Sequence, residues 1–232
     1  MVSAAYLALV RESTPPSGLA ARWQSVYRFF PWEDWRLQRP TVVDRHIIPA
    51  LDRWIEEGDV AEERERRRVR AGVSFGLFDS PWDGERVLER YELLYQLGLS
   101  PEAVRDAGEA GRRLARPDFE KYVGLEMAFD HRRILATAVG RIRAKIRYRP
   151  VVFELMPETF TLLQLQRAVE ALAGVKLHKQ NFRRLVEQGG LVEGTGRFDH
   201  NTGGRPAELF RFRREVLLER PAPGVGLPAA SR

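Results

Sequence analysis

The pattern of apolar and polar positions predicts strands at the start of the chain and helices after them. Residues 2–10 form an apolar run that is compatible with a strand buried on both faces, and residues 24–30 form a second β-compatible run. Between residues 41 and 55 the apolar side chains recur at helical spacing, and Pro49 is expected to weaken or kink that helix.

The central region is predicted to be mostly helical. Residues 56–70 are nearly all charged, with mixed signs, which indicates an exposed helix or a surface loop. Helices are predicted from Pro81 to Gly98, after the capping residues Asp79 and Ser80, and over residues 101–114 and 119–147. The apolar stripe of the last helix is expected either to pack within its own subunit or to form part of a dimer contact.

The C-terminal third predicts a helix-turn-helix. Thr161 and Gln164 have the spacing of a capping box, and Gly174 is a natural end for the helix that they begin. A second helix is predicted from residue 178 to Gly189, with its apolar positions turned toward the first helix. At about 100° per residue, its polar side chains point away from the core; they are Gln180, Arg183, Arg184 and Glu187. Two short helices in this arrangement are typical of DNA-binding proteins.

The residues that follow predict a wing. Brief strands are expected at residues 191–193 and 208–212, and the intervening residues 194–206 are rich in glycine and polar side chains. Helix, helix, strand, loop and strand is the order of a winged helix. The predicted wing carries Arg197, His200, Asn201, Thr202 and Arg205. Arg205 lies in Gly-Gly-Arg-Pro, which can present an arginine to a narrow minor groove.

Composition and charge narrow the function classes. The 232 residues, 44% hydrophobic and 30% charged, are globular in composition and suffice for one large or two modest domains. The absence of cysteine excludes disulfides and thiolate chemistry, and no apolar run reaches the ~20 residues of a membrane span. Because the apolar start lacks a basic leader, we expect a cytoplasmic protein. The net charge of +6 favours a polyanionic partner.

Candidate enzyme chemistry is sparse. The four histidines are scattered, and Glu33 and Asp34 are adjacent in sequence rather than placed across a cleft. The aromatic side chains around this pair are expected in the core rather than in a ligand cage. No nucleophile elbow or phosphate-binding glycine loop is present. We therefore expect no catalytic residue, no metal site and no cofactor.

Several motifs carry a resemblance to a known family. In order along the chain they are Tyr-Arg-Pro-Val-Val-Phe (148–153), Phe-Thr-Leu-Leu-Gln-Leu-Gln (160–166), Lys-Gln-Asn-Phe-Arg-Arg (179–184) and Gly-Arg-Pro-Ala-Glu-Leu-Phe-Arg-Phe (204–212). They resemble the C-terminal winged helix of the Nudix-related transcriptional regulators of NAD metabolism. Residues 31–36, 86–95 and 129–138 more loosely resemble the alphaproteobacterial branch of that family.

The resemblance implies a repressor that binds a palindromic operator as a homodimer through the winged helix. Its N-terminal domain would be a Nudix-type sensor, with ADP-ribose or a related NAD metabolite as effector. The Nudix motif G-x5-E-x7-R-E-x2-E-E-x-G is absent, and the acid-rich residues 56–65 lack its spacing. The chain is therefore expected to begin partway into the sensor fold, through a truncated gene model or loss of the first half. A second chain would then supply a partner for strand 2–10.

The sequence thus predicts an α+β protein that is mostly helical. Residues 1–149 are expected to form a partial Nudix-like sensor and dimerisation domain, 150–216 a winged helix, and 217–232 a disordered tail. The predicted partner is double-stranded DNA. The candidate DNA-binding residues are Lys179, Gln180, Asn181, Arg183, Arg184, Arg197, Thr202 and Arg205. Two alternatives stay open: a winged helix that binds a protein partner, and a residual Nudix-type hydrolase.

Overall fold

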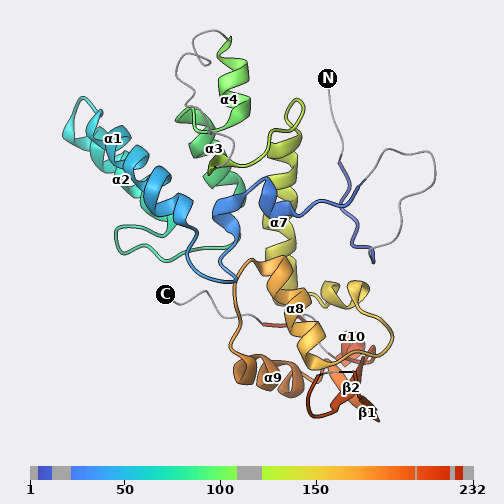
Figure 1. Ribbon diagram of the computed structural model, residues 1–232. Helices are drawn as coiled ribbons and strands as arrows, with labels where there is room; N and C mark the ends of the chain where they lie inside the picture. The colour runs from blue at the N-terminus through green and yellow to red at the C-terminus, as the bar shows by residue number, and fades with distance from the viewer. Residues whose placement is uncertain (1–4, 12–21, 109–121, 202, 220–222, 227–232) are drawn as a thin grey trace. The chain divides into compact units, whose positions relative to one another are not determined.

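A computed structural model describes residues 5–11, 22–108, 122–201, 203–219 and 223–226 (Figure 1). They fall into two compact units. The helical unit lies between residues 23 and 141, and the C-terminal unit comprises residues 142–226 together with the start of the chain. The boundary lies inside helix α7 (His131–Tyr148) rather than at residues 149–150. A sensor and dimerisation role for residues 1–149 remains a prediction.

The prediction of two strands near the start of the chain is wrong. Residues 5–10 are extended but unpaired and mostly exposed, and residues 2–4 lie outside the described part. Leu9 packs against the core of the C-terminal unit, and the Arg11 guanidinium donates to the carbonyl of Met156. A strand needs a neighbour for its backbone groups, and the described sheet consists of two strands elsewhere in the chain. Pairing of residues 2–10 with a second chain remains a prediction.

Residues 24–30 form a short helical turn instead of a strand. The 3₁₀ helix η1 (Val26–Arg28) begins after Ser25, whose hydroxyl accepts the amide of Tyr27, and η2 (Pro31–Glu33) follows it. Phe30 and Trp32 are fully buried, as expected for core aromatic residues.

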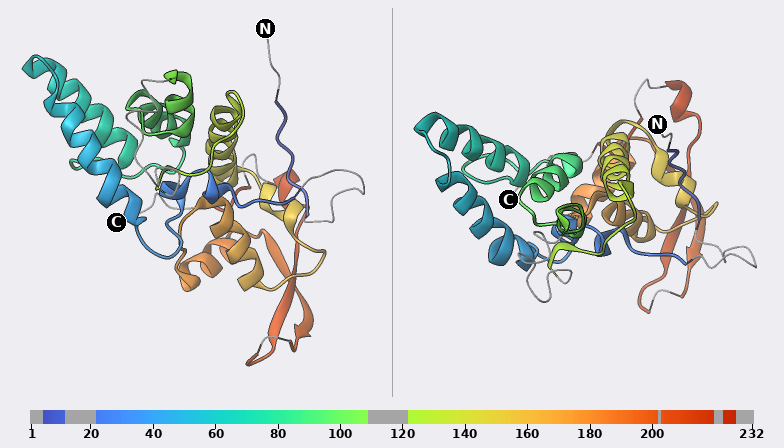
Figure 2. Two further views of the ribbon diagram at one scale, coloured as in Figure 1. Left: turned by 45° about the horizontal axis from the view of Figure 1, so that its top comes forward. Right: turned by 90° about the horizontal axis from the view of Figure 1, so that it is seen from above.

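Pro49 has the predicted effect on the first long helix. The π-helix η3 (Val43–Ile47) directly precedes α1 (Ile48–Glu56), with the proline in the first turn of α1. A proline clashes with the carbonyl four residues before it, and the wider π turn at this point relieves such a clash. The helix α2 (Ala61–Phe75) runs antiparallel beside α1 in all the views of Figures 1 and 2. The charged run at residues 56–70 is therefore largely an exposed helix.

The next two helices are shorter than predicted. The helix α3 (Val87–Gln96) begins six residues after Pro81, because the carbonyl of Asp83 accepts a hydrogen bond from Arg90 and holds the preceding segment in a turn. The helix α4 (Pro101–Asp106) begins at Ser100, whose hydroxyl caps the amide of Ala103. Residues 109–114 of the predicted helix lie outside the described residues.

The predicted helix over residues 119–147 is also shorter, since α7 begins only at His131. Gly124 has a φ of 81°, and a Cβ there would lie 2.4 Å from the carbonyl oxygen of Phe29. This close approach fixes a turn that no continuous helix could make. Farther along α7, Ile142 and Ile146 are buried in the core of their own chain. Those two side chains therefore pack within the subunit.

The core of the helical unit encloses a buried ion pair. The Arg90 guanidinium donates to both carboxylate oxygens of Glu33 at 2.5 and 3.0 Å, and both side chains are at most 1% exposed. It also donates to the carbonyls of Ser74 and Asp83 and lies 3.9 Å from the ring centroid of Trp82. Because its charge and its donors are satisfied, burial of this arginine is tolerated. No local sequence pattern indicates that Glu33 and Arg90 meet.

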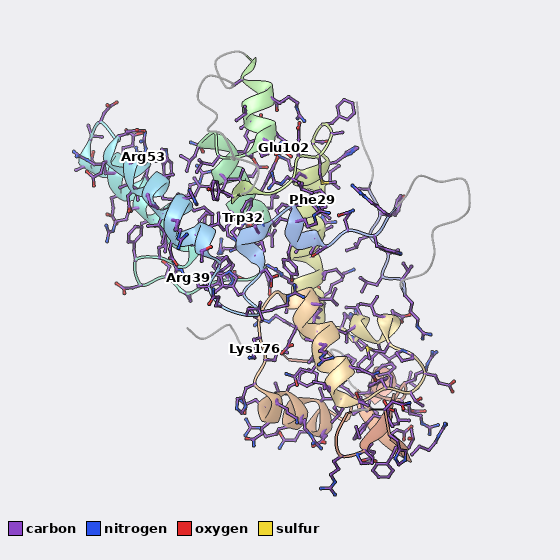
Figure 3. The ribbon with its side chains drawn as sticks, in the orientation of Figure 1. Phe29, Trp32, Arg39, Arg53, Glu102 and Lys176 are labelled. Carbon is purple, nitrogen blue, oxygen red and sulfur yellow. The ribbon has the colours of Figure 1, made fainter. Side chains whose placement is uncertain are left out.

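A second buried arginine, Arg132 at the start of α7, links three segments. It donates to Glu102 at 3.0 Å and to the carbonyls of Phe29 and Val123. Phe29 and Glu102, both labelled in Figure 3, are thus joined through one side chain. Burial lowers the pKa of the Arg132 guanidinium, and the Glu102 carboxylate opposes that shift.

The C-terminal unit contains a helical pair followed by a two-stranded antiparallel sheet. Its elements are η4 (Val151–Leu155), α8 (Leu162–Ala173), α9 (Lys179–Gln188), β1 (Val192–Asp199), β2 (Ala207–Phe212) and α10 (Val216–Glu219). Val192 pairs with Phe212 and Asp199 with Ala207, so the hairpin forms the long ribbon seen in Figure 2. Phe210 and Phe212 pack against the core of this unit, as their shared face predicts. No described helix is long and apolar enough to span a bilayer.

The predicted disordered tail is wrong for part of its length. The short helix α10 covers residues 216–219, and Val225 is buried. The amides of Val225 and Gly226 donate to the carbonyls of Ile146 and Arg147 at the end of α7. A Cβ at Gly224 would lie 2.2 Å from the backbone of Arg147, so only glycine fits this contact. Residues 220–222 and 227–232 lie outside the described residues.

We predict that Glu33→Gln lowers the free energy of unfolding of the helical unit by about 3–5 kcal/mol, because it leaves the buried Arg90 without a counter-charge. Urea unfolding followed by tryptophan fluorescence measures this, since all five tryptophans lie between residues 23 and 82. The matched control is Asp34→Asn, whose partner Arg36 is 36% exposed. It should cost about 0–1 kcal/mol. Equal losses in the two variants would contradict the role of the buried pair.

Candidate nucleic-acid interface

The first helix of the pair, α8, begins with the predicted capping box. The Thr161 hydroxyl accepts the Gln164 amide at 3.2 Å, and the Gln164 side chain accepts the Thr161 amide at 2.7 Å. Gly174 ends the helix with a φ of 76°, in the left-handed region that favours glycine. Both helix limits predicted from the sequence are therefore confirmed.

The turn between α8 and α9 is held by side chains that the sequence analysis missed. The Gln166 amide group donates to the carbonyl of Leu177 at 2.9 Å, and the amide of Leu177 donates to Glu170 at 2.8 Å. Gln166 also donates to Glu170 at 3.0 Å. These bonds satisfy both backbone groups of one turn residue and so fix the direction in which α9 departs. The i and i+4 spacing of Gln166 and Glu170 was visible in the sequence, but their shared target was not.

The second helix, α9, has one buried and one exposed face. Phe182 and Val186 are buried against the core, and Leu185 is half-buried beside them. The predicted DNA-binding side chains of this helix are all exposed on the structure; they are Lys179, Gln180, Asn181, Arg183 and Arg184. The face predicted to point outward therefore does so.

Arg183 does not stand alone on that face. Its guanidinium lies 3.3 Å from the carboxylate of Glu187, one helical turn later, and both side chains are about half exposed. The pair is weak in water. It nevertheless places one acidic group in the middle of a surface that is otherwise polar and basic.

The wing is shorter than predicted because its first strand is longer. Strand β1 continues from Val192 to Asp199, so Arg197 lies on a strand and the tip covers residues 200–206. A register irregularity between Gly194 and Phe198 absorbs the extra residues. The hydroxyl of Thr195 donates to the carbonyl of Leu209 at 2.7 Å and pins this part of the ribbon.

The predicted wing residues lie on the ribbon or its tip. Arg197, His200, Asn201 and Arg205 are exposed, and the Asn201 amide donates to the side chain of Asp199 at 2.9 Å. Thr202 lies outside the described residues. No sequence motif singled out Arg211 of β2, which is exposed and pairs across the strands with Glu193 at 2.6 Å. Among the described residues, no group of three histidine or acidic side chains is placed to hold a metal ion.

Comparison with known proteins identifies the C-terminal segment. Residues 152–212 match the NrtR DNA-binding winged helix domain family. A curated relative, the "ADPR responsive transcriptional repressor NtrR" of Acinetobacter baylyi, is 41% identical over 93 residues. That match covers 40% of this chain and 37% of the relative, so the chain spans well under half of the length of the relative it matches.

Two solved structures are similar over a comparable share of the chain. One is Shewanella oneidensis NrtR complexed with a 27mer DNA, with 35% identity and a TM-score of 0.35 over 40% of this chain and 42% of that one. The other is Shewanella oneidensis NrtR, with 36% identity and a TM-score of 0.34 over 40% and 41%.

The order of elements and the family match define residues 152–212 as a winged helix domain. It is a winged helix of the NrtR type, as the resemblance to Nudix-related regulators of NAD metabolism implied.

We predict that Gln166→Met destabilises the C-terminal unit by about 1–3 kcal/mol, because it leaves the carbonyl of Leu177 without its donor. Urea unfolding followed by far-UV circular dichroism measures this loss, and the tryptophan transition of the helical unit should not move. The control Gln188→Met, at the exposed end of α9, should stay within about 0.5 kcal/mol of the parent. If Gln166→Met leaves the stability of the C-terminal unit unchanged, the hydrogen bond from Gln166 to Leu177 does not hold the turn.

Proposed function

We propose that this protein is a DNA-binding transcriptional repressor of NAD-metabolism genes, which binds a palindromic operator as a homodimer. The observation that carries the proposal is the exposed basic face of α9 within a domain that matches a DNA-binding winged helix family. The relative from Acinetobacter baylyi is described as a transcriptional repressor, which supports the repressor role. Such a protein acts in the cytoplasm. Its N-terminal region would be a sensor domain, and the winged helix would follow it.

The proposed roles of the side chains follow from their positions. Gln180, Arg183 and Arg184 face the major groove, where arginine pairs bidentately with guanine. Lys179 and Arg197 hold phosphates and set the register of the protein on DNA, with Asn181 beside them on the helix. Arg205 on the wing tip, three residues after Thr202 in the sequence, enters the minor groove.

The proposed effector is ADP-ribose or a related NAD metabolite. The support is the name of the relative, which responds to ADP-ribose. The chain lacks the glutamate motif of Nudix hydrolases, so binding without hydrolysis is the activity proposed for its N-terminal region. Under this proposal the protein has no catalytic residue, metal or cofactor of its own.

The direct test is fluorescence anisotropy on DNA upstream of the protein's own gene, with scrambled DNA as the comparison. A repressor should prefer the upstream fragment by about 10³-fold or more. The alternative, a winged helix that binds a protein partner, predicts weak binding that does not distinguish the two DNAs and ignores changes in the wing. The match to a DNA-binding family favours the first outcome.

We predict that Arg183→Ala weakens binding to the preferred site by about 1–3 kcal/mol and relaxes the base preference at one position, because a bidentate base contact is lost. Competition with single-base variants of the site measures both effects. Arg53→Ala removes an equal charge from an exposed position of α1 and serves as the control. If both variants lose the same affinity on every sequence, Arg183 does not read a base.

Lys179→Ala should behave differently, since a phosphate contact carries no sequence information. We predict uniform weakening on specific and scrambled DNA, with the slope of log K against log salt reduced by about one. Anisotropy titrations at several salt concentrations measure the slope. A loss of affinity that depends on the DNA sequence would show that Lys179 contacts a base edge rather than a phosphate.

A further inference from the structure

A cleft of about 430 Å³ lies in the helical unit, beside the start of α7. Its volume falls within the range of ~300–1,000 Å³ that is usual for small-molecule sites. The residues that matter for its chemistry come from α3, α4 and the segment before α7; they are Tyr91, Tyr95, Glu102, Arg105, Phe129 and Asp130. The proposed DNA-binding surface uses none of them.

Phe129 is held at the rim in an unfavourable conformation. Its side chain is 79% exposed, and its φ of 51° lies in the left-handed region that a bulky residue avoids. Arg105 fixes the segment by donating to the carbonyls of Met127 and Phe129, each at 3.1 Å. Glu102 accepts the amide of Met127 at 3.0 Å. Backbone strain of this kind clusters at functional sites.

Tyr91 supplies a polar group to the same cleft from a buried position. The residue is only 2% exposed, and its hydroxyl has no hydrogen-bond partner among the described residues. Burial, reinforced by the nearby Glu102 carboxylate, raises the pKa of Tyr91 to about 12. The phenol is protonated at neutral pH, as an unshifted tyrosine also is, and it can donate or accept a hydrogen bond.

The charges around the cleft leave an acidic surplus. Arg105 pairs with Asp106 and Glu126, Arg132 with Glu102, and Arg133 with Glu92. The carboxylate of Asp130 is exposed, and the described residues offer it no ion pair. It directly precedes His131, the first residue of α7. Three carboxylates thus line the cleft, those of Glu102, Asp106 and Asp130, against the two arginines Arg105 and Arg133, both already engaged in ion pairs.

From the aromatic side chains, the unpartnered phenol and the surplus carboxylate, we infer that this cleft binds a planar aromatic cation. The ring of the ligand stacks on the exposed ring of Phe129, because the face of an aromatic ring attracts positive charge. The charged group of the ligand, with its N–H donors, lies toward the carboxylate of Asp130. The hydroxyl of Tyr91 makes a hydrogen bond with the end of the ligand that lies deepest in the cleft.

The same cleft has a direct connection to the winged helix. Helix α7 begins beside the cleft at His131, and its last residues, from Ile142 onward, belong to the C-terminal unit. A ligand bound beside the first turn of α7 is therefore expected to change DNA binding. This second step, unlike the ligand site itself, rests on the proposed function.

The site is tested by isothermal titration calorimetry of the full chain with benzamidine, a planar aromatic cation, and with benzamide, its neutral isostere. Benzamidine should bind with a Kd of about 1 mM or tighter, as expected for so small a ligand, and benzamide at least about tenfold more weakly. Equal affinities would overturn the assignment to a cation. No heat with benzamidine at millimolar concentration would overturn the site.

Variants locate the binding. Asp130→Asn and Phe129→Ala should each weaken benzamidine at least about fivefold, since each removes one contact of about 1 kcal/mol. Phe78→Ala is the matched control, because Phe78 also has a φ of 51° and is exposed but does not line the cleft. It should bind like the parent. Parental affinity in both cleft variants would place the ligand elsewhere and overturn the inference.

Phe129→Gly distinguishes a ligand contact from a structural role. Glycine tolerates a positive φ, so this variant should be as stable as the parent or more so while losing the same affinity. A large loss of stability would show instead that Phe129 is needed for folding.

Anisotropy with saturating benzamidine tests the coupling between the cleft and DNA binding: the DNA affinity should change at least about threefold. If the parent prefers no DNA sequence, the proposed function fails and the calorimetric result on the cleft is unaffected.

Discussion

The geometry of the winged helix depends on one turn, in which Gln166 and Glu170 of α8 bind the carbonyl and the amide of Leu177. A recognition helix can read bases only if its direction is fixed to within a fraction of a turn, and this turn determines where α9 points. The apolar contacts of Phe182 and Val186 hold α9 against the core, but such contacts tolerate sliding. The directional hydrogen bonds remove that freedom. Gln166 and Glu170 lie on the same helix that the capping box of Thr161 and Gln164 begins.

In the helical unit the polar constraints are ionic and lie inside the core. Arg90 and Arg132 each gather carbonyls and a carboxylate from segments far apart in the sequence. The described part of this unit contains no sheet. Backbone carbonyls of its irregular segments therefore accept hydrogen bonds from these two side chains, whereas in a sheet they would accept them from a neighbouring strand. The same arrangement holds the turn before α7 and thereby the exposed ring of Phe129. The cleft and the core are consequently parts of one polar framework.

The sequence predicted helices α8 and α9 well because their signals are local. Capping residues, a left-handed glycine and apolar spacing fix both helices, whereas the first strand of the hairpin is longer than predicted. The N-terminal strands were wrong because an apolar run such as residues 5–10 does not reveal whether a neighbouring strand exists. Helix α7 was overextended because the close approach of Gly124 to Phe29 is a tertiary contact. The pairing of Glu33 with Arg90 joins residues 57 positions apart, and nothing in the local pattern indicates it.

The measurement that tests the central claim most directly is selection of DNA by the full chain from a library of duplexes with a random core. A core of about 20 base pairs spans two half-sites one helical turn apart. A repressor with a recognition helix placed as described should enrich one inverted-repeat sequence. The enrichment should be lost when the polar face of α9 is replaced. A library that stays random after several rounds, although the protein is folded, would contradict sequence-specific DNA binding.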